Sequence, residues 1–168
     1  MWKVRCHRTQ EEGVVVSPVS VNTYIEVKTF YALQMRLLDA LDIEGYAATF
    51  TEDGVTDHAH RGEKVEGRAA LIAGANAALP RYAGAAVRHW NDHYVIEEVD
   101  ENTLNVSYCS LVTRTDKAGN VTFEPTFFIE DVLVRVDGGL QARSRTIHRD
   151  EPSPVAIAAA AAAREGAA

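Results

Sequence analysis

The sequence predicts an α+β fold in which three helices come first and an antiparallel sheet of long strands follows. Before Pro80, apolar residues recur every three to four positions, which is the period of an amphipathic helix. After Pro80, four long strand-like segments are separated by turn signals of the kind that close hairpins. At 168 residues the chain is long enough for one domain with a core and too short for two ordinary ones. A twisted sheet of such strands is expected to curl around the helices.

The first predicted helix covers about residues 22–41, and Asn22 or Thr23 can cap its start. Its charged residues fall largely away from the apolar positions, so one side of the helix is expected to face the core. That side is formed by Ile25, Phe30, Leu33, Leu37, Leu38 and Leu41.

Two shorter helices are predicted after the first. Residues 42–50 form one of them, because Asp42 is a capping residue and the following apolar residues share one side. A short strand at 55–60 and a loop at 61–63 come next. The Ala-rich segment 67–79 forms the third helix and ends before Pro80, whose ring cannot continue a helix.

The predicted strands of the C-terminal half form an antiparallel meander, because each is joined to the next by a hairpin signal. The turns are Asp-Glu-Asn at 100–102, a Gly-Asn segment at 116–120 and Asp-Gly-Gly at 137–139. The strands themselves cover residues 85–99, 104–115, 121–136 and 140–148.

Strand alternation assigns each residue of these segments to one of two faces. In the last strand the arginines, including Arg145, fall on the outward face, whereas Ala142 falls on the inward one. In 85–99 neither face is plainly apolar. One carries Val87, His89, Asn91, His93 and Val95, and the other Arg88, Trp90, Asp92, Tyr94 and Ile96, unless a bulge interrupts the alternation and turns His93 outward.

Composition excludes several classes of partner. The net charge of -7 and a pI near 5.3 leave no basic stripe for nucleic acid. Cys6 and Cys109 lie far apart with no Cys or His cluster, which predicts neither a disulfide framework nor a structural zinc site. No apolar segment has the length of a signal peptide or a membrane span. The sequence therefore predicts a cytoplasmic protein that binds no nucleic acid and no membrane.

Three segments are expected along the chain. Residues 1–20 have no helical period and are predicted to be a mobile extension or a short edge strand. Residues 21–150 form the folded domain. Residues 151–168 are an Ala-rich flexible tail, either nascent helix or disorder, with little to bury.

Four motifs follow one another along the chain: Tyr-Ala-Ala-Thr-Phe-Thr-Glu-Asp-Gly-Val (46–55), Gly-Arg-Ala-Ala-Leu-Ile (67–72), His-Trp (89–90) and Leu-Val-Arg-Val-Asp-Gly-Gly (133–139). In this order they resemble the SnoaL-like branch of the NTF2-like superfamily. The resemblance covers about residues 23–150, and it implies a cone in which three N-terminal helices pack in a curved antiparallel sheet. It also implies one deep ligand pocket between the concave face and the helices, and a homodimer formed through the convex face.

The branch includes polyketide cyclases, and the superfamily includes scytalone dehydratase, so the resemblance implies an acid–base site. In that dehydratase an aspartate just after the first helix orients a histidine on the first long strand, and Asp42 and His89 occupy the matching places. His89, oriented by Asp42, would then be a general base. The alternative is that Asp42 only caps the second helix and that His89 is a hydrogen-bonded core residue.

Other polar residues are candidates for the same site. Asp131, in an otherwise apolar row, can serve as an acid or base, or can instead pair with Arg135 or an arginine of the last strand. His58 takes the place of a substrate-binding tyrosine of the dehydratase and faces either the pocket or a surface loop. The predicted substrate-binding residues are His58, Tyr46, Tyr108, Ser110, Phe127 and Ile129.

No metal or cofactor is expected. His89 and His93 are about 13 Å apart along a strand, too far to share one ion, and no phosphate-binding loop is present. The first functional hypothesis is a cofactor-independent enzyme that cyclises, dehydrates or isomerises a hydrophobic aromatic or polyketide-like molecule. The second is a non-catalytic ligand carrier or accessory subunit of the same fold.

Overall fold

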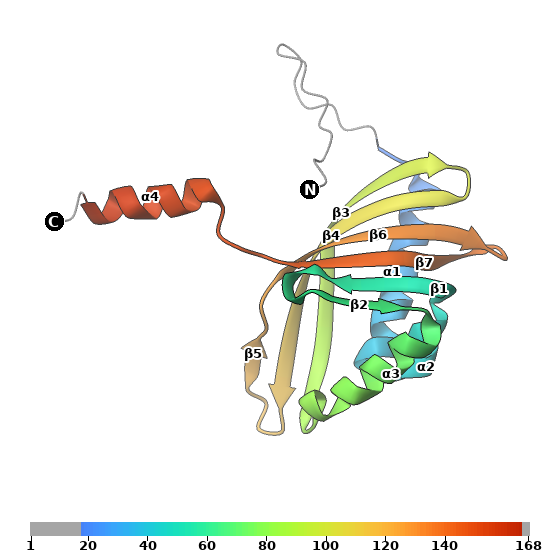
Figure 1. Ribbon diagram of the computed structural model, residues 1–168, viewed down its shortest axis with the longest axis horizontal. Coiled ribbons are helices and arrows are strands. Elements are labelled where there is room, and N and C mark those ends of the chain that lie inside the picture. Colours follow the sequence, from blue (N-terminus) through green and yellow to red (C-terminus); the bar gives the residue numbers. More distant parts are fainter. Residues whose placement is uncertain (1–17, 166–168) are drawn as a thin grey trace, which may run out of the picture.

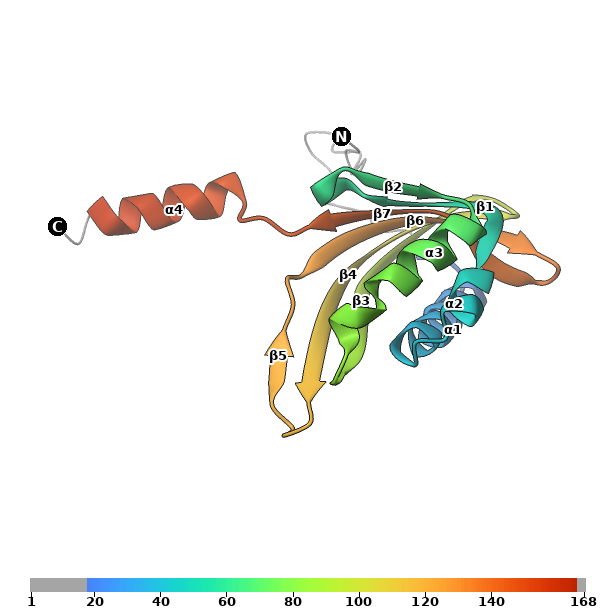
Figure 2. The same cartoon turned by 60° about the horizontal axis from the view of Figure 1, so that its bottom comes forward.

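The predicted α+β architecture is confirmed by a computed structural model, which describes residues 18–165 (Figure 1). Helices α1 (Val21–Asp39), α2 (Ile43–Ala48) and α3 (Arg68–Ala78) lie on the concave side of one curved sheet (Figure 2). We call this side the helix-covered face. Residues 1–17 of the predicted N-terminal extension lie outside the described residues.

The sheet has the order β2-β1-β7-β6-β4-β3, and β5 pairs with β4. Strands β3, β4, β6 and β7 form the predicted antiparallel meander, and β1 joins the edge of β7 in parallel. The strands are β1 (Phe50–His58), β2 (Glu63–Glu66), β3 (Ala85–Asp100), β4 (Thr103–Asp116), β5 (Val121–Phe123), β6 (Phe127–Val136) and β7 (Gly139–Arg149), and the short 3-10 helices are η1 (Ala59–Arg61) and η2 (Leu79–Tyr82).

Three strand predictions were wrong. The strand predicted at 55–60 is β1, which begins earlier, at Phe50, and ends at His58, where η1 follows. The segment 121–136 is two strands, β5 and β6, and Pro125 lies between them. A proline has no backbone N–H for the ladder, which accounts for the break. Strand β2 was predicted to lie partly in a loop. It is a short edge strand with exposed Glu63, Lys64 and Glu66, and so lacks the apolar alternation by which strands are recognised.

The start and the buried side of α1 differ from the prediction. Ser20 is the N-cap, and its hydroxyl accepts a hydrogen bond from the backbone N–H of Thr23 at 3.0 Å. Ile25 and Leu33 are each 56% exposed. The buried residues of α1 recur at helical spacing and include two polar ones, Thr23 and Gln34. The full set is Thr23, Val27, Phe30, Tyr31, Gln34 and Met35.

A bulge in β3 reverses the alternation of that strand. The pairing with β4 shifts between Asp92 and Val95, and His93 has a positive φ of 59°. His93 is exposed, as the bulge alternative predicted. Beyond the bulge Tyr94 and Ile96 pack against the core, so their predicted place on the face opposite His89 was wrong.

A second bulge lies in β7. Val132 of β6 pairs with Ser144, whereas the next residue, Leu133, pairs with Ala142, so that Arg143 has no partner in the ladder. Ala142 and Arg145 therefore both face the helices, and both are buried. The predicted outward orientation of Arg145 was wrong for this reason.

The core lies between the meander and the helices. Its fully buried members come from α1, β1, β4, β6 and β7, which ties the helices to the middle of the sheet. They include Val27, Tyr31, Phe50, Leu104, Val106, Tyr108, Leu133 and Ala142.

The opposite, convex face of the sheet carries exposed apolar side chains. On β3, Trp90 is 59% and Val95 is 61% exposed, and the homodimer expected through this face stays a prediction. Helix α4 (Pro154–Glu165) extends away from the sheet (Figure 1). None of the helices within residues 18–165 is both long and apolar enough to cross a membrane.

Candidate functional site

A histidine–carboxylate pair joins α1 to β3. His89 Nδ1 lies 2.7 Å from Asp39 Oδ1, and only 17% of the His89 side chain and 8% of the Asp39 side chain are exposed. Asp39 is the last residue of α1, and His89 precedes the bulge on the helix-covered face. The helix end and the strand thus hold the two groups in one geometry.

The expected pairing of Asp42 with His89 was wrong, because Asp39 occupies that place. Asp42 caps α2 instead, and its Oδ1 accepts a hydrogen bond from the backbone N–H of Gly45 at 2.9 Å. This is the alternative that the sequence left open for Asp42. Leu41, with a positive φ of 59°, turns the chain between the two aspartates.

The pair determines which imidazole nitrogen is basic. An ionised carboxylate only accepts hydrogen bonds, so the proton lies on His89 Nδ1 and is donated to Asp39. Nε2 then carries the lone pair. The same carboxylate stabilises the imidazolium that forms when Nε2 takes a proton, as a general base requires.

A second polar group is fully buried in the centre of the same face. Arg145 and Asp131 form an ion pair at 2.6 Å, with 3% and 0% of their side chains exposed. Arg145 thus resolves the alternatives that the sequence left for Asp131. The remaining hydrogen bonds join the pair to α1, α2 and β4: Tyr31 (2.9 Å) and Tyr108 (3.4 Å) donate to Asp131, and Arg145 donates to Gln34 (2.6 Å) and Tyr46 (3.1 Å).

This network is closed and electrically balanced. Burial raises the pKa of Tyr31, Tyr46 and Tyr108, so all three remain neutral phenols. The Asp131 carboxylate accepts hydrogen bonds from Arg145 and from two of these phenols, and none of its side chain is exposed. Asp131, Tyr46 and Tyr108 therefore hold the fold together and take no part in the proposed chemistry.

Other residues of the helix-covered face lie near His89. Asn91, Ser110 and Phe127 are direct cross-strand neighbours on β3, β4 and β6. Ile129 lies two residues beyond Phe127 on β6 and pairs with Tyr108 of β4. We call Phe127 and Ile129 the apolar row. The predicted residues Ser110, Phe127 and Ile129 therefore lie together on the helix-covered face. Ser110 is paired with Asn91, which is two residues from His89.

His58 lies at the other side of the row. Thr56 pairs with Arg145, so strand alternation places His58 of β1 on the helix-covered face. Its ring is 6.1 Å from the ring of His60, which is 5.5 Å from the ring of Phe127. His58 Nδ1 is buried and has no hydrogen-bond partner among residues 18–165.

Burial, with smaller effects from Arg61 and His60, lowers the pKa of His58 from 6.5 to about 4. In the unfolded chain His58 takes up its proton near pH 6.5, so between about pH 6.5 and 4 the unfolded state binds more protons. Stability therefore falls as the pH falls through this window.

The His58→Gln variant is expected to lose this acid sensitivity, because glutamine does not titrate. Since the ring is partly exposed, we expect wild-type protein to lose roughly 1–2 kcal/mol more than the variant between pH 6.5 and 4. Urea unfolding at several pH values measures the difference. Parallel pH profiles for the two proteins would contradict a buried neutral His58.

One polar residue of this face was given no role by the sequence. Asn91 was expected on the same side as His89, but only its place in the alternation was known. In the structure both its Oδ1 and its Nδ2 are buried and have no hydrogen-bond partner among the described residues. Because buried amide atoms are nearly always paired, Asn91 is a candidate ligand contact.

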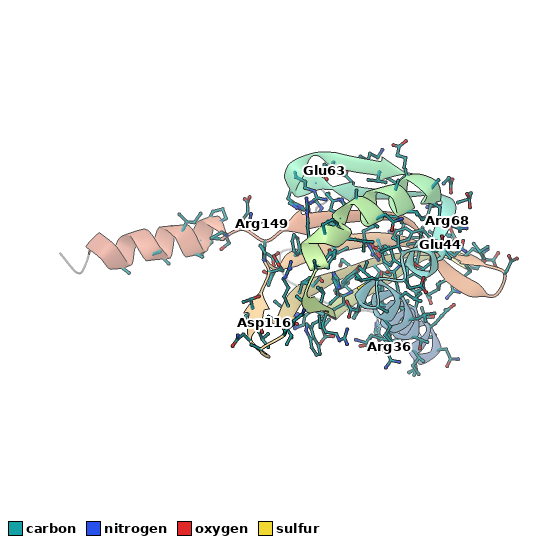
Figure 3. All side chains as sticks on the ribbon, turned by 90° about the horizontal axis from the view of Figure 1, so that it is seen from below. Arg36, Glu44, Glu63, Arg68, Asp116 and Arg149 are labelled. Carbon is teal, nitrogen blue, oxygen red and sulfur yellow. The ribbon has the colours of Figure 1, made fainter. Side chains whose placement is uncertain are left out.

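Charged groups lie around the edge of the helix-covered face. Viewed from the helix side, Arg36, Asp116 and Arg149 lie at its rim (Figure 3). Residues 18–165 contain no group of three or more His, Cys, Asp and Glu side chains arranged to hold a metal ion. The candidate ligand contacts on this face are therefore Phe127 and Ile129, which are apolar, and the polar residues His89, Asn91, Ser110 and His58.

Comparisons with known proteins identify the family. The SnoaL-like domain model matches residues 19–146. Aln2 from a Streptomyces species is 41% identical, over 85% of this chain and 99% of that chain, with a TM-score of 0.74. A protein from Catenulispora acidiphila, solved in complex with S-DNPA, is 33% identical over 78% and 96%, with a TM-score of 0.71.

Fold similarity extends further than sequence similarity. An NTF2-like protein from Novosphingobium aromaticivorans is 21% identical over 82% of this chain and 88% of that chain, with a TM-score of 0.66, and shows that the fold is NTF2-like. No curated protein matches the sequence. The family match over residues 19–146, together with the relatives above 30% identity, shows that the chain belongs to the SnoaL-like family.

Proposed function

We propose that this protein is an enzyme that moves protons on a hydrophobic, aromatic or polyketide-like small molecule and so cyclises, dehydrates or isomerises it. His89 is the general base, and Asp39 is the positioning residue that orients it. The observation that supports this most directly is the 2.7 Å contact between Asp39 Oδ1 and His89 Nδ1, which leaves Nε2 as the basic nitrogen.

The proposed reaction starts with removal of a proton from a carbon beside a carbonyl. The electron pair of the C–H bond moves into the enolate, and His89 becomes an imidazolium stabilised by Asp39. The imidazolium then returns the same proton. It goes to another carbon in an isomerisation, to a departing hydroxyl that leaves as water in a dehydration, or to the attacked carbonyl oxygen in a cyclisation.

The substrate would lie along the row that begins beside His89. Phe127 and Ile129 supply apolar contact, and Ser110 and His58 supply polar contact, as a small-molecule site requires. Because His58 is neutral at pH 7, it can accept or donate a hydrogen bond without adding charge. The S-DNPA complex of the Catenulispora relative supports a small-molecule ligand for this family.

The His89→Gln variant tests the base. We expect turnover of a panel of polycyclic polyketides to fall by roughly 10²- to 10⁴-fold, since glutamine cannot take up a proton at neutral pH. Ligand affinity, followed by fluorescence quenching, should change by less than about threefold, because glutamine keeps polar atoms in a similar place.

His148→Gln is the matched control. His148 lies on β7, contacts Glu130 at 3.1 Å and is 42% exposed, away from the proposed site. Its substitution should leave turnover unchanged. Unchanged turnover in His89→Gln, or equal losses in both variants, would overturn the assignment of His89 as the base.

A further inference from the structure

The side chain of Asn91 can form hydrogen bonds with a ligand, and it forms none with the described part of the protein. Its carboxamide offers one acceptor, Oδ1, and two N–H donors on Nδ2. Both atoms are shielded from solvent, and neither has a hydrogen-bond partner among residues 18–165. Leaving both ends of a buried amide unpaired is unfavourable, so a structural asparagine at this position would be expected to have at least one partner.

The place of Asn91 relates it to the proposed base. The register between β3 and β4 is continuous from Ala85 to Asp92, so Asn91 and His89 lie on the same face. Residues two apart on a strand are separated by about 7 Å. Ser110 is directly opposite Asn91 and Phe127 follows, which places the carboxamide at the polar start of the apolar row.

We propose that Asn91 determines substrate specificity, and that its carboxamide donates a hydrogen bond from Nδ2 to a carbonyl oxygen of a fused-ring aromatic substrate. Oδ1 can then accept from a substrate hydroxyl that is not itself bonded to that carbonyl. The inference rests on the proposed function, because its ligand is the proposed substrate class.

Binding of two probes of the same shape tests this role. 1-Tetralone carries a carbonyl on its fused rings, whereas 1-methylenetetralin has a CH₂ group in place of the carbonyl oxygen. Wild-type protein is expected to bind the first about tenfold more tightly, as measured by calorimetry. Asn91→Leu should bind the two probes with about equal affinity, because leucine has neither a hydrogen-bond donor nor an acceptor.

Asn105→Leu is the matched control. Asn105 is on β4, where its Nδ2 makes an exposed contact of 3.5 Å with Glu97, and its substitution should keep the tenfold preference. Thermal unfolding separates recognition from structure. Asn91→Leu should melt at or above the wild-type temperature, because no protein hydrogen bond is lost, whereas a fall of more than roughly 4 °C would indicate a structural role and overturn the proposal.

His89→Gln distinguishes failure of this inference from failure of the proposed function. Loss of turnover with the tenfold preference intact would support both. Unchanged turnover in His89→Gln, with a preference that still disappears in Asn91→Leu, would overturn the base and leave the role of Asn91 standing. A preference that persists in Asn91→Leu, or is absent from the wild type, would overturn the role of Asn91 whatever His89→Gln does.

Discussion

Asp39→Asn is expected to lower turnover by roughly 10²- to 10⁴-fold while leaving the fold intact. The Oδ2 end of the carboxylate faces two donors, the backbone N–H of His89 at 3.4 Å and the Arg88 guanidinium at 3.8 Å. An asparagine would place its oxygen there and turn its NH₂ group toward His89 Nδ1. Nδ1 would then have to accept, the imidazole proton would move to Nε2, and the basic nitrogen would be lost.

Asp42→Asn is the matched control, since it makes the same change three residues further along the chain. Asparagine is as good an N-cap as aspartate, so α2 should remain capped and turnover should not change. Steady-state kinetics on one substrate compares the two variants. A loss of turnover in Asp42→Asn with normal Asp39→Asn would show that the carboxylate predicted from the sequence, and not the one paired in the structure, supports the base.

These two aspartates show where sequence reasoning about the site reached its limit. The resemblance placed a carboxylate near the end of the first helix, and α1 does end at Asp39. Asp42 is equally close to that end and has the stronger local signal, because capping favours aspartate there. Which of the two meets His89 depends on the turn at Leu41, whose positive φ no local pattern indicated.

The strands show the same limit in another form. Where a strand has no bulge, alternation predicted the faces correctly, as for His89, Ser110 and Ile129. Beyond a bulge each residue changes face, so Tyr94 and Arg145 were assigned to the wrong side. The order of helices and strands was predictable because hydrophobic period and turn residues are local. The sequence left an arginine of the last strand as one possible partner of Asp131, but the extra residue in β7 that turns Arg145 toward it was not predictable from a local pattern.

Arg145→Met is expected to have the largest effect on stability. The substitution would leave the Asp131 carboxylate buried without a counterion, and would remove the hydrogen bonds that Arg145 donates to Gln34 of α1 and Tyr46 of α2. Breaking a buried pair of this kind costs about 3–5 kcal/mol. Urea unfolding, monitored by circular dichroism, would measure the loss in the free energy of unfolding.

Arg135→Met provides the matched control. Arg135 is on β6 of the same sheet and pairs with Glu26 of α1 at 2.8 Å, but unlike Arg145 its side chain is partly exposed. Its loss should cost no more than about 1 kcal/mol. The double variant Arg145→Met/Asp131→Asn buries no charge, and should recover roughly 1–4 kcal/mol relative to Arg145→Met. If the losses of Arg145→Met alone and Asp131→Asn alone simply add in the double variant, the two residues act independently, and the ion pair is not what joins α1 and α2 to the sheet.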